Sequence, residues 1–151
     1  MSDVLVPVRV NGVGAEIPTG RITNQQWEQI VETSDEWIRK NIGIKTRSRI
    51  EPERSTTDLG VAAAHKALAM AGVPAGAIDM ILCATNSQEE LFPSTASKIQ
   101  AALDMPRASA TDLQAGCTGW LYGMELGTAM VSSGQAQHVL VVGAEALSRA
   151  L

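Results

Sequence analysis

Aromatic side chains and cysteines are scarce in this sequence. Aromatic residues make up 3% of the 151 residues, and the two cysteines are Cys83 and Cys117. Two cysteines so far apart form neither a disulfide framework nor the paired spacing of a zinc site, so we expect a reduced, cytoplasmic protein that binds no metal. Apolar residues instead reach 45%, mainly Ala, Val, Leu, Ile and Met, which is enough for a closely packed core.

Long apolar runs are also lacking. No stretch approaches the roughly 18 apolar residues that span a bilayer, and the start of the chain has no charged segment followed by a long apolar run. The sequence therefore predicts neither a membrane segment nor a signal peptide. A net charge of −4 argues against a general nucleic-acid-binding protein.

Positive charge is concentrated in one stretch of this acidic chain. Residues 39–54 hold six basic residues against two acidic ones. Such a stretch is either a solvated strand and loop or a binding surface for phosphates or an acidic partner. The sequence leaves both interpretations open.

The first third of the chain predicts short elements. Alternating apolar residues favour a strand over residues 4–13. Two capping-box patterns, at residues 23–26 and 33–36, each begin a short helix. Residues 44–50 alternate apolar or small residues with basic ones, which favours one arm of a hairpin.

From Thr56 onwards the pattern becomes regular. A helix begins at the polar residues 56–58 and ends at Gly72, with Pro74 just beyond. Apolar strands then alternate with helices; we expect strands at residues 80–85, 108–113 and 138–144, and helices from Pro93 to about Leu103 and from Cys117 to Ser132. This alternation is typical of a mostly parallel sheet covered on both faces, so the predicted fold class is α/β.

Residues 12–17 begin like a dinucleotide-binding fingerprint. The third glycine is missing, however, and Pro18 interrupts the helix that should follow. We therefore do not expect a nicotinamide cofactor, and the sequence has neither a phosphate-binding P-loop nor a metal-binding cluster.

The most informative segment is Asp112–Trp120, where Cys117 stands between two glycines as a strand passes into a helix. The N–H groups at a helix N-terminus favour the thiolate, which is the nucleophilic form of cysteine. The helix that follows is apolar nearly all round, so we expect it to be buried. These features predict a nucleophilic Cys117. A packing role is the alternative for a lone cysteine, and we assign that role to Cys83.

The sequence is similar to 3-oxoacyl-[acyl-carrier-protein] synthase III, a ketoacyl synthase of the thiolase-like superfamily that starts fatty-acid chains. The resemblance runs in register along nearly the whole chain, and it is carried by Thr33–Ile38, Gly43–Ile44, Phe92–Ser94, Asp112–Gly119 and Val141–Glu145. It implies a thiolase-like fold in which residues 1–151 form the N-terminal half-domain of a duplicated αβαβα architecture.

The resemblance implies that Cys117 takes an acyl group from acyl-CoA and that the acyl-enzyme condenses with malonyl-acyl-carrier protein. It also implies that Trp37 stacks on the adenine of coenzyme A, that Thr33 is a neighbouring adenine contact, and that Phe92 reaches across a homodimer interface into the acyl pocket. The structural alternatives are that Trp37 anchors a core and that Thr33 serves only as a helix cap. No cofactor is implied, because the coenzyme A thioester is a substrate.

Two departures from the family pattern qualify this expectation. Asn41 stands where the family has an arginine that completes the adenine clamp, and an amide does not replace a stacked guanidinium. The catalytic histidine and asparagine of the family lie in a second half, and neither His65 nor His138 matches that histidine. We therefore expect the chain to require a C-terminal half or a partner chain for activity.

Two other functions remain open at this stage. One is a secondary-metabolism acyltransferase of the same fold that forms an ester or an amide. The other is a non-catalytic scaffold half of a two-chain condensing enzyme.

Overall fold

The computed structural model describes residues 7–150, and the chain divides into two compact units. Unit 1 holds the residues up to Glu16 together with Ser55–Glu145, and unit 2 holds Ile17–Arg54 together with the residues from Ala146 onwards. Each unit contains its own small sheet.

Unit 1 is built on a three-stranded parallel sheet. Its strands are β3 (Met80–Ala84), β4 (Ser109–Leu113) and β5 (Val139–Gly143), in the spatial order β4-β3-β5. In the register of the sheet, Cys83 lies between Asp112 on β4 and Val142 on β5. The predicted parallel sheet is therefore confirmed, and its three strands end at a common edge.

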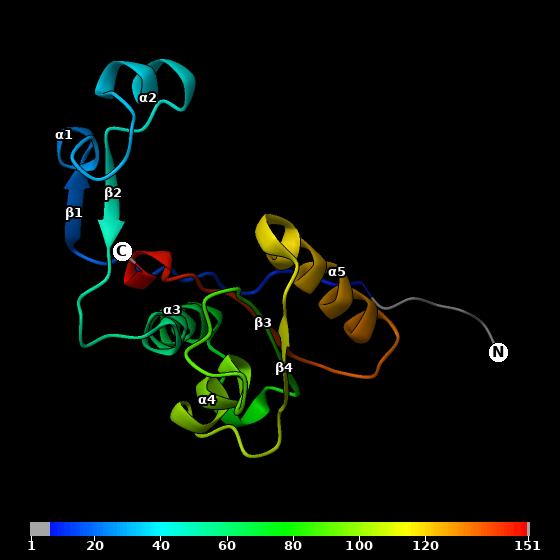
Figure 1. Cartoon of the computed structure of the whole chain (residues 1–151). Helices are drawn as coiled ribbons and strands as arrows, with labels where there is room; N and C mark the ends of the chain where they lie inside the picture. The colour runs from blue at the N-terminus through cyan, green and yellow to red at the C-terminus, as the bar shows by residue number, and fades with distance from the viewer. Residues whose placement is uncertain (1–6, 151) are drawn as a thin grey trace. The chain divides into compact units, whose positions relative to one another are not determined.

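Helices cover both faces of this sheet (Figure 1). Helices α3 (Thr56–Ala71) and α4 (Thr95–Ala102) lie on one side, and α5 (Gly119–Ser132) lies on the other. A short 3-10 turn, η1 (Ala75–Ala77), leads from α3 towards β3. The arrangement is the α/β class expected from the sequence.

The core of unit 1 lies between the sheet and the pair α3 and α4. Gly60 brings the two helices close, because a Cβ atom at this position would stand 2.7 Å from Cδ1 of Ile99. The buried cluster consists of Ala64, Ile78, Ile81, Cys83, Ala96, Ile99, Leu103, Met105, Ala108, Leu140, Val142 and Ala144.

Side-chain caps define where α3 and α4 begin. Ser55 and Asp58 form a capping box at α3, which ends at Gly72 in the left-handed conformation, as expected for a C-terminal glycine. At α4, the Ser94 side chain accepts a hydrogen bond from the backbone N–H of Ser97. Pro93 therefore precedes the cap, and its expected place at the first helical position is wrong because Ser94 caps the helix.

The predicted N-terminal strand is wrong where the structure describes it. Residues 4–6 lie outside the described residues, and residues 7–14 form no strand. This segment runs against α3, where a Cβ atom on Gly12 would stand 2.4 Å from the carbonyl oxygen of Ala67. A cavity of about 1130 Å³ is lined by the segment and by the edge strand β5, and the alternating residues do not pair with that edge.

Unit 2 consists of a two-stranded antiparallel sheet with short helices. Strands β1 (Gly20–Thr23) and β2 (Thr46–Arg49) pair along their full length, which confirms the predicted hairpin arm. The remaining elements of the unit are α1 (Asn24–Trp27), α2 (Asp35–Asn41) and the 3-10 turn η3 (Leu147–Ala150).

The two capping patterns of unit 2 have different outcomes. The capping box at residues 23–26 is confirmed, with Thr23 and Gln26 bonded reciprocally. At α2 the cap is Ser34, which accepts the backbone N–H of Trp37, rather than the expected Thr33. This one-residue shift leaves the Thr33 hydroxyl outside the helix start.

Candidate active site

Cys117 lies in a single 3-10 turn, η2 (Gly116–Thr118), between the end of β4 and the start of α5. Gly116 has a φ of 57°, a conformation that glycine adopts at little cost, and this allows the sharp change of direction. The side chain of Cys117 is exposed. The predicted helix from Cys117 therefore begins two residues later, at Gly119, and the thiol lies just before it.

The N-terminus of α5 lacks a side-chain cap. Thr118 occupies the cap position, but its hydroxyl donates to the carbonyl oxygen of Ala115 at 2.9 Å and makes no cap bond to the helix. Helices α1, α2, α3 and α4 all have side-chain caps. The N–H of Gly119 donates to the carbonyl oxygen of Gly116, but no side chain occupies the N–H groups at the start of α5 beside Cys117.

The carboxyl ends of all three parallel strands meet where α5 begins. The N–H of Thr85, after β3, donates to the carbonyl oxygen of Leu113 on β4 at 3.2 Å, and the N–H of Ala144 donates to that of Ala84 at 3.0 Å. In open α/β sheets, ligands bind at this edge of the strands. The position of Cys117 therefore agrees with the usual location of a site in such a sheet.

Three glycines bring α5 very close to the sheet. A Cβ atom on Gly119 would stand 3.0 Å from Cβ of Ala84, one on Gly123 would stand 2.8 Å from Cγ1 of Val141, and one on Gly127 would lie 3.1 Å from Cγ1 of Val139. These glycines are spaced four residues apart, so they form one face of the helix. The helix, and with it the turn that carries Cys117, is held against the strand ends.

The opposite side of α5 is exposed, so the expectation of a helix buried all round is wrong for this chain. Glycines make the close approach to the sheet, and several large apolar side chains of the helix stay exposed, namely Leu121, Tyr122 and Leu126. Trp120 is 46% exposed but packs beside Gly143 at the end of β5. An exposed apolar surface of this kind marks an interaction site.

Asp112 anchors the start of α4 to the strand that leads to Cys117. Its two carboxylate oxygens accept the backbone N–H groups of Thr95 at 2.9 Å and Ala96 at 2.7 Å. Sequence reasoning placed Asp112 in the cysteine motif but assigned it no role. The signal available was an acidic residue inside an otherwise weakly polar strand.

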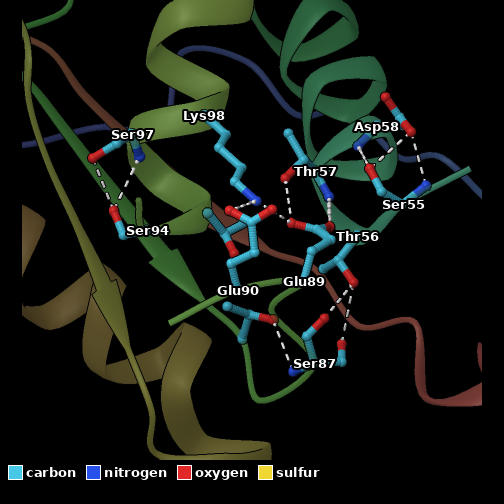
Figure 2. A network of polar contacts seen from close by, with 12 residues as sticks. Ser55, Thr56, Thr57, Asp58, Ser87, Glu89, Glu90, Ser94, Ser97 and Lys98 are labelled. Carbon is cyan, nitrogen blue, oxygen red and sulfur yellow. Dashed lines mark hydrogen bonds and ion pairs between the residues drawn. The ribbon is translucent and has the colours of Figure 1, made fainter. Parts of the chain in front are cut away.

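Phe92 belongs to the loop between β3 and α4, in the same unit as Cys117. Phe92 is 87% exposed and its neighbour Leu91 is 92% exposed. The loop is held by a set of polar contacts that join it to the starts of α3 and α4 (Figure 2). The sequence did not predict these contacts.

Thr33 and Trp37 come together in unit 2. Both line a hollow of about 300 Å³, together with Glu32 and Ser34, and Trp37 is 55% exposed. The Asn41 side chain turns back on its own helix, where its Nδ2 atom donates to the carbonyl oxygen of Trp37 at 2.9 Å. An open indole beside a hydroxyl offers a flat stacking surface with a hydrogen-bonding group next to it.

Several side chains of the basic stretch are engaged within unit 2. The Arg47 guanidinium lies 5.0 Å from the centre of the Trp27 ring and donates to Oδ1 of the buried Asn24 at 2.9 Å. Arg39 pairs with Asp35 at 2.7 Å. These two arginines support the local structure, and the exposed bases left for a phosphate or an acidic partner include Lys40, Lys45 and Arg49.

No metal site is found in the described part of the chain. Within residues 7–150, no group of three or more His, Cys, Asp or Glu side chains is arranged to hold an ion. His65 is exposed on α3, and His138 directly precedes β5. Over the same residues, each helix is too short or too polar to cross a bilayer.

Comparisons with known proteins agree with the resemblance read from the sequence. Residues 111–151 match the family model of 3-oxoacyl-[acyl-carrier-protein] synthase III. A beta-ketoacyl-[acyl-carrier-protein] synthase III of Rhodospirillum centenum is 44% identical over 148 residues, which are 97% of this chain and 46% of that protein. The chain therefore spans about half the length of the curated relatives it matches.

Solved structures lead to the same family. The 3-oxoacyl-[acyl-carrier-protein] synthase III of Aquifex aeolicus superposes with a TM-score of 0.88 and 40% identity, over 92% of this chain and 45% of that one. The priming beta-ketosynthase of the R1128 polyketide pathway superposes with a TM-score of 0.89 and 32% identity, over 93% of this chain and 42% of that one. The predicted thiolase-like α/β fold is confirmed.

Proposed function

Because this chain corresponds to the N-terminal portion of 3-oxoacyl-[acyl-carrier-protein] synthase III, we propose that, together with a second half, it forms a condensing enzyme that starts fatty-acid chains. The observation that carries this proposal is the exposed thiol of Cys117 beside the uncapped N-terminus of α5. The enzyme would act in the cytoplasm, where a free thiol stays reduced.

In the first step the Cys117 thiolate attacks the carbonyl carbon of an acyl-CoA. A new carbon–sulfur bond forms, the bond to the coenzyme A sulfur breaks, and coenzyme A leaves as its thiolate. Negative charge develops on the carbonyl oxygen during the attack. Backbone N–H groups at the start of α5, where no side chain caps the helix, are suited to stabilise that charge, which is usually the largest single contribution in acyl transfer.

In the second step a malonyl-acyl-carrier protein loses carbon dioxide. The electron pair of the broken carbon–carbon bond attacks the acyl carbonyl on Cys117, the thioester to the enzyme breaks, and a 3-oxoacyl-acyl-carrier protein leaves. This step needs polar groups that polarise the malonyl thioester carbonyl. By resemblance these groups come from the second half, so the chain alone is not a competent synthase.

The donor would bind with its adenine at the hollow lined by Thr33 and Trp37. The exposed indole supports stacking, and the neighbouring hydroxyl supports a polar contact to the ring. Asn41 is bonded back to the Trp37 carbonyl oxygen and provides no second stacking plane. We therefore expect weaker coenzyme A binding than an arginine at this position would give.

The exposed side of α5 would be covered by the second half. Its apolar side chains, from Trp120 to Leu126, are large enough to support a stable interface once they are buried. The exposed Phe92 supports a homodimer in which this residue enters the acyl pocket of the partner copy. The two surfaces are separate parts of unit 1, one on α5 and one on the β3–α4 loop.

An acyltransferase of secondary metabolism is the second candidate. The likeness to a priming ketosynthase of a polyketide pathway and the presence of Asn41 favour an unusual donor or acceptor. Mass spectrometry of the product separates the candidates, because condensation adds two carbons and releases carbon dioxide, whereas ester or amide formation does neither.

Acylation of Cys117 tests the proposal directly. In the assembly with a second half, the Cys117→Ala variant should form no covalent acyl-enzyme with radiolabelled acyl-CoA, because the nucleophile is gone. Cys83→Ala is the matched control and should be acylated like the parent, since Cys83 is buried within the sheet. Labelling of Cys117→Ala, or slow thiol reactivity without any acyl-enzyme in the parent, would support the scaffold function instead.

A further inference from the structure

The loop between β3 and α4 is fixed at its base by exposed and partly buried polar contacts. The N–H of Asn86 and the hydroxyl of Ser87 both donate to the Glu145 carboxylate at 2.6 Å. The hydroxyl of Thr56, which is fully buried at the start of α3, donates to the carbonyl oxygen of Ser87 at 2.6 Å. These contacts join the first part of the loop to the segment after β5 and to the start of α3.

Glu89 fixes the middle of the same loop. Its Oε1 accepts the backbone N–H of Thr57 at 2.8 Å, and its Oε2 accepts the Thr57 hydroxyl at 2.9 Å and the Lys98 ammonium at 3.3 Å. Figure 2 shows the carboxylate between the start of α3 and the Lys98 side chain of α4. Burial raises the pKa of Glu89, but the hydrogen bonds from Thr57 and Lys98 outweigh it, so the pKa is lowered and the group is charged at neutral pH.

The tip of the loop contrasts with this fixed base. Leu91 and Phe92, directly after the acidic pair Glu89 and Glu90, are the most exposed large apolar residues in the described part of the chain. The loop is fixed by its contacts with Glu145, with Thr56 and through Glu89. Its two exposed apolar side chains therefore suit a partner surface, since the loop loses little conformational entropy on binding.

We propose that Glu89 is a positioning residue for acyl-chain selectivity: it holds the loop so that Leu91 and Phe92 enter the acyl pocket of the partner copy at a fixed depth. This inference rests on the proposed function, in which Phe92 lines that pocket. Phe92 is three residues from the carboxylate anchor, a span of at most about 10 Å of chain, so loss of the anchor moves the tip directly. The length of acyl chain that fits then changes.

The test uses the assembled dimeric enzyme and single-turnover acylation of Cys117 by straight-chain donors from acetyl-CoA to octanoyl-CoA. In Glu89→Ala, the ratio of the rates for short and long donors should change by about 10-fold, because three hydrogen bonds to one half-buried carboxylate are lost. Thr57→Val keeps the bond from the backbone N–H and should change the ratio by about 3-fold. Each rate is divided by the concentration of active enzyme, measured by active-site titration, so that variants with different active fractions can be compared.

Glu90→Ala is the matched control. Glu90 is a neighbouring glutamate whose side chain is 60% exposed and pairs with Lys98 at 3.4 Å. Its removal should leave the donor ratio unchanged. Amide hydrogen exchange of residues 86–92 supplies a second readout and should be about 10-fold faster in Glu89→Ala but not in Glu90→Ala.

An unchanged donor ratio in Glu89→Ala, with normal acylation of Cys117, would overturn the positioning role and leave the proposed function standing. If Glu89→Ala does not fold, an unchanged ratio in Thr57→Val has the same meaning. Failure of the parent enzyme to acylate Cys117 at all would instead overturn the proposed function, and the positioning role with it.

Discussion

The two faces of the parallel sheet in unit 1 differ in how complete they are. On the face covered by α3 and α4, large apolar side chains such as Ile81 and Ile99 are fully buried. On the face covered by α5, the close contact is made through glycines, and several large apolar side chains of the helix stay exposed. The apolar side chains of the first face are already buried in a core, whereas the helix on the second face carries an apolar surface suited to another layer of protein. The thiol of Cys117 lies just before the N-terminus of α5, the helix with the exposed apolar surface.

The two cysteines give the strongest test of this difference. Burial, together with the carboxylates of Asp112, Glu145 and Glu89, raises the pKa of Cys83 to about 12. Iodoacetamide at about pH 8 should therefore alkylate Cys117 at least ~100-fold faster than Cys83 in the native protein, because the thiolate is the reactive form. Peptide mass spectrometry locates the label, and denatured protein is the control in which both react. Equal alkylation rates of the two cysteines in the native protein would mean that solvent and reagent reach Cys83 in the core.

Truncations on the two faces should differ by several kcal/mol. Ile99→Ala, on α4, should lower the free energy of unfolding by about 2–5 kcal/mol because it leaves a cavity in a closed core. Leu126→Ala, on the exposed side of α5, should change it by less than about 0.5 kcal/mol in the isolated chain. Urea unfolding followed by circular dichroism measures both.

The same leucine variant extends the comparison to the assembly. In complex with the second half, Leu126→Ala should weaken association, since the side chain is then buried. If Leu126→Ala lowered the free energy of unfolding of the isolated chain as much as Ile99→Ala does, the outer side of α5 would already be packed without a partner.

The smallest expected effect is the pH dependence contributed by Glu89 on the closed side. Because the pKa of Glu89 is lowered from 4.5 in the folded chain, the unfolded chain binds this proton more readily. Its contribution to stability is complete above pH 4.5 and is lost as the pH falls through the lowered pKa. Glu89→Gln should therefore flatten the fall of the urea midpoint in acid, whereas Glu90→Gln should not. A steep fall retained in Glu89→Gln would assign the acid sensitivity to other carboxylates.

Local signals in the sequence predicted the order and type of most elements. The glycine at position 72, the capping box at residues 23–26 and the apolar run at residues 80–84 each act through neighbouring residues, so they could be read without coordinates. Residues 7–13 mislead for the opposite reason. Their alternation suits a strand, but a strand also needs an edge to pair with, and that depends on parts of the chain far away in sequence.

The candidate site also combines features that follow from local sequence with contacts between residues distant in the sequence. The position of Cys117 between a strand and a helix follows from residues 109–132 alone. The clamp on Glu89 joins residues more than 30 positions apart, and the anchoring of α4 by Asp112 joins residues 16 and 17 positions apart. Neither has a local pattern that would predict it.

By itself the sequence determined the α/β class, the nucleophile candidate and the family resemblance, because each rests on short-range patterns or on residues in register. Only the tertiary structure decided that the apolar helix after Cys117 is covered on one side and bare on the other. Helical periodicity shows which residues share a face, but the face that meets the sheet is chosen by steric fit, and only the glycine face of α5 approaches the strands closely enough.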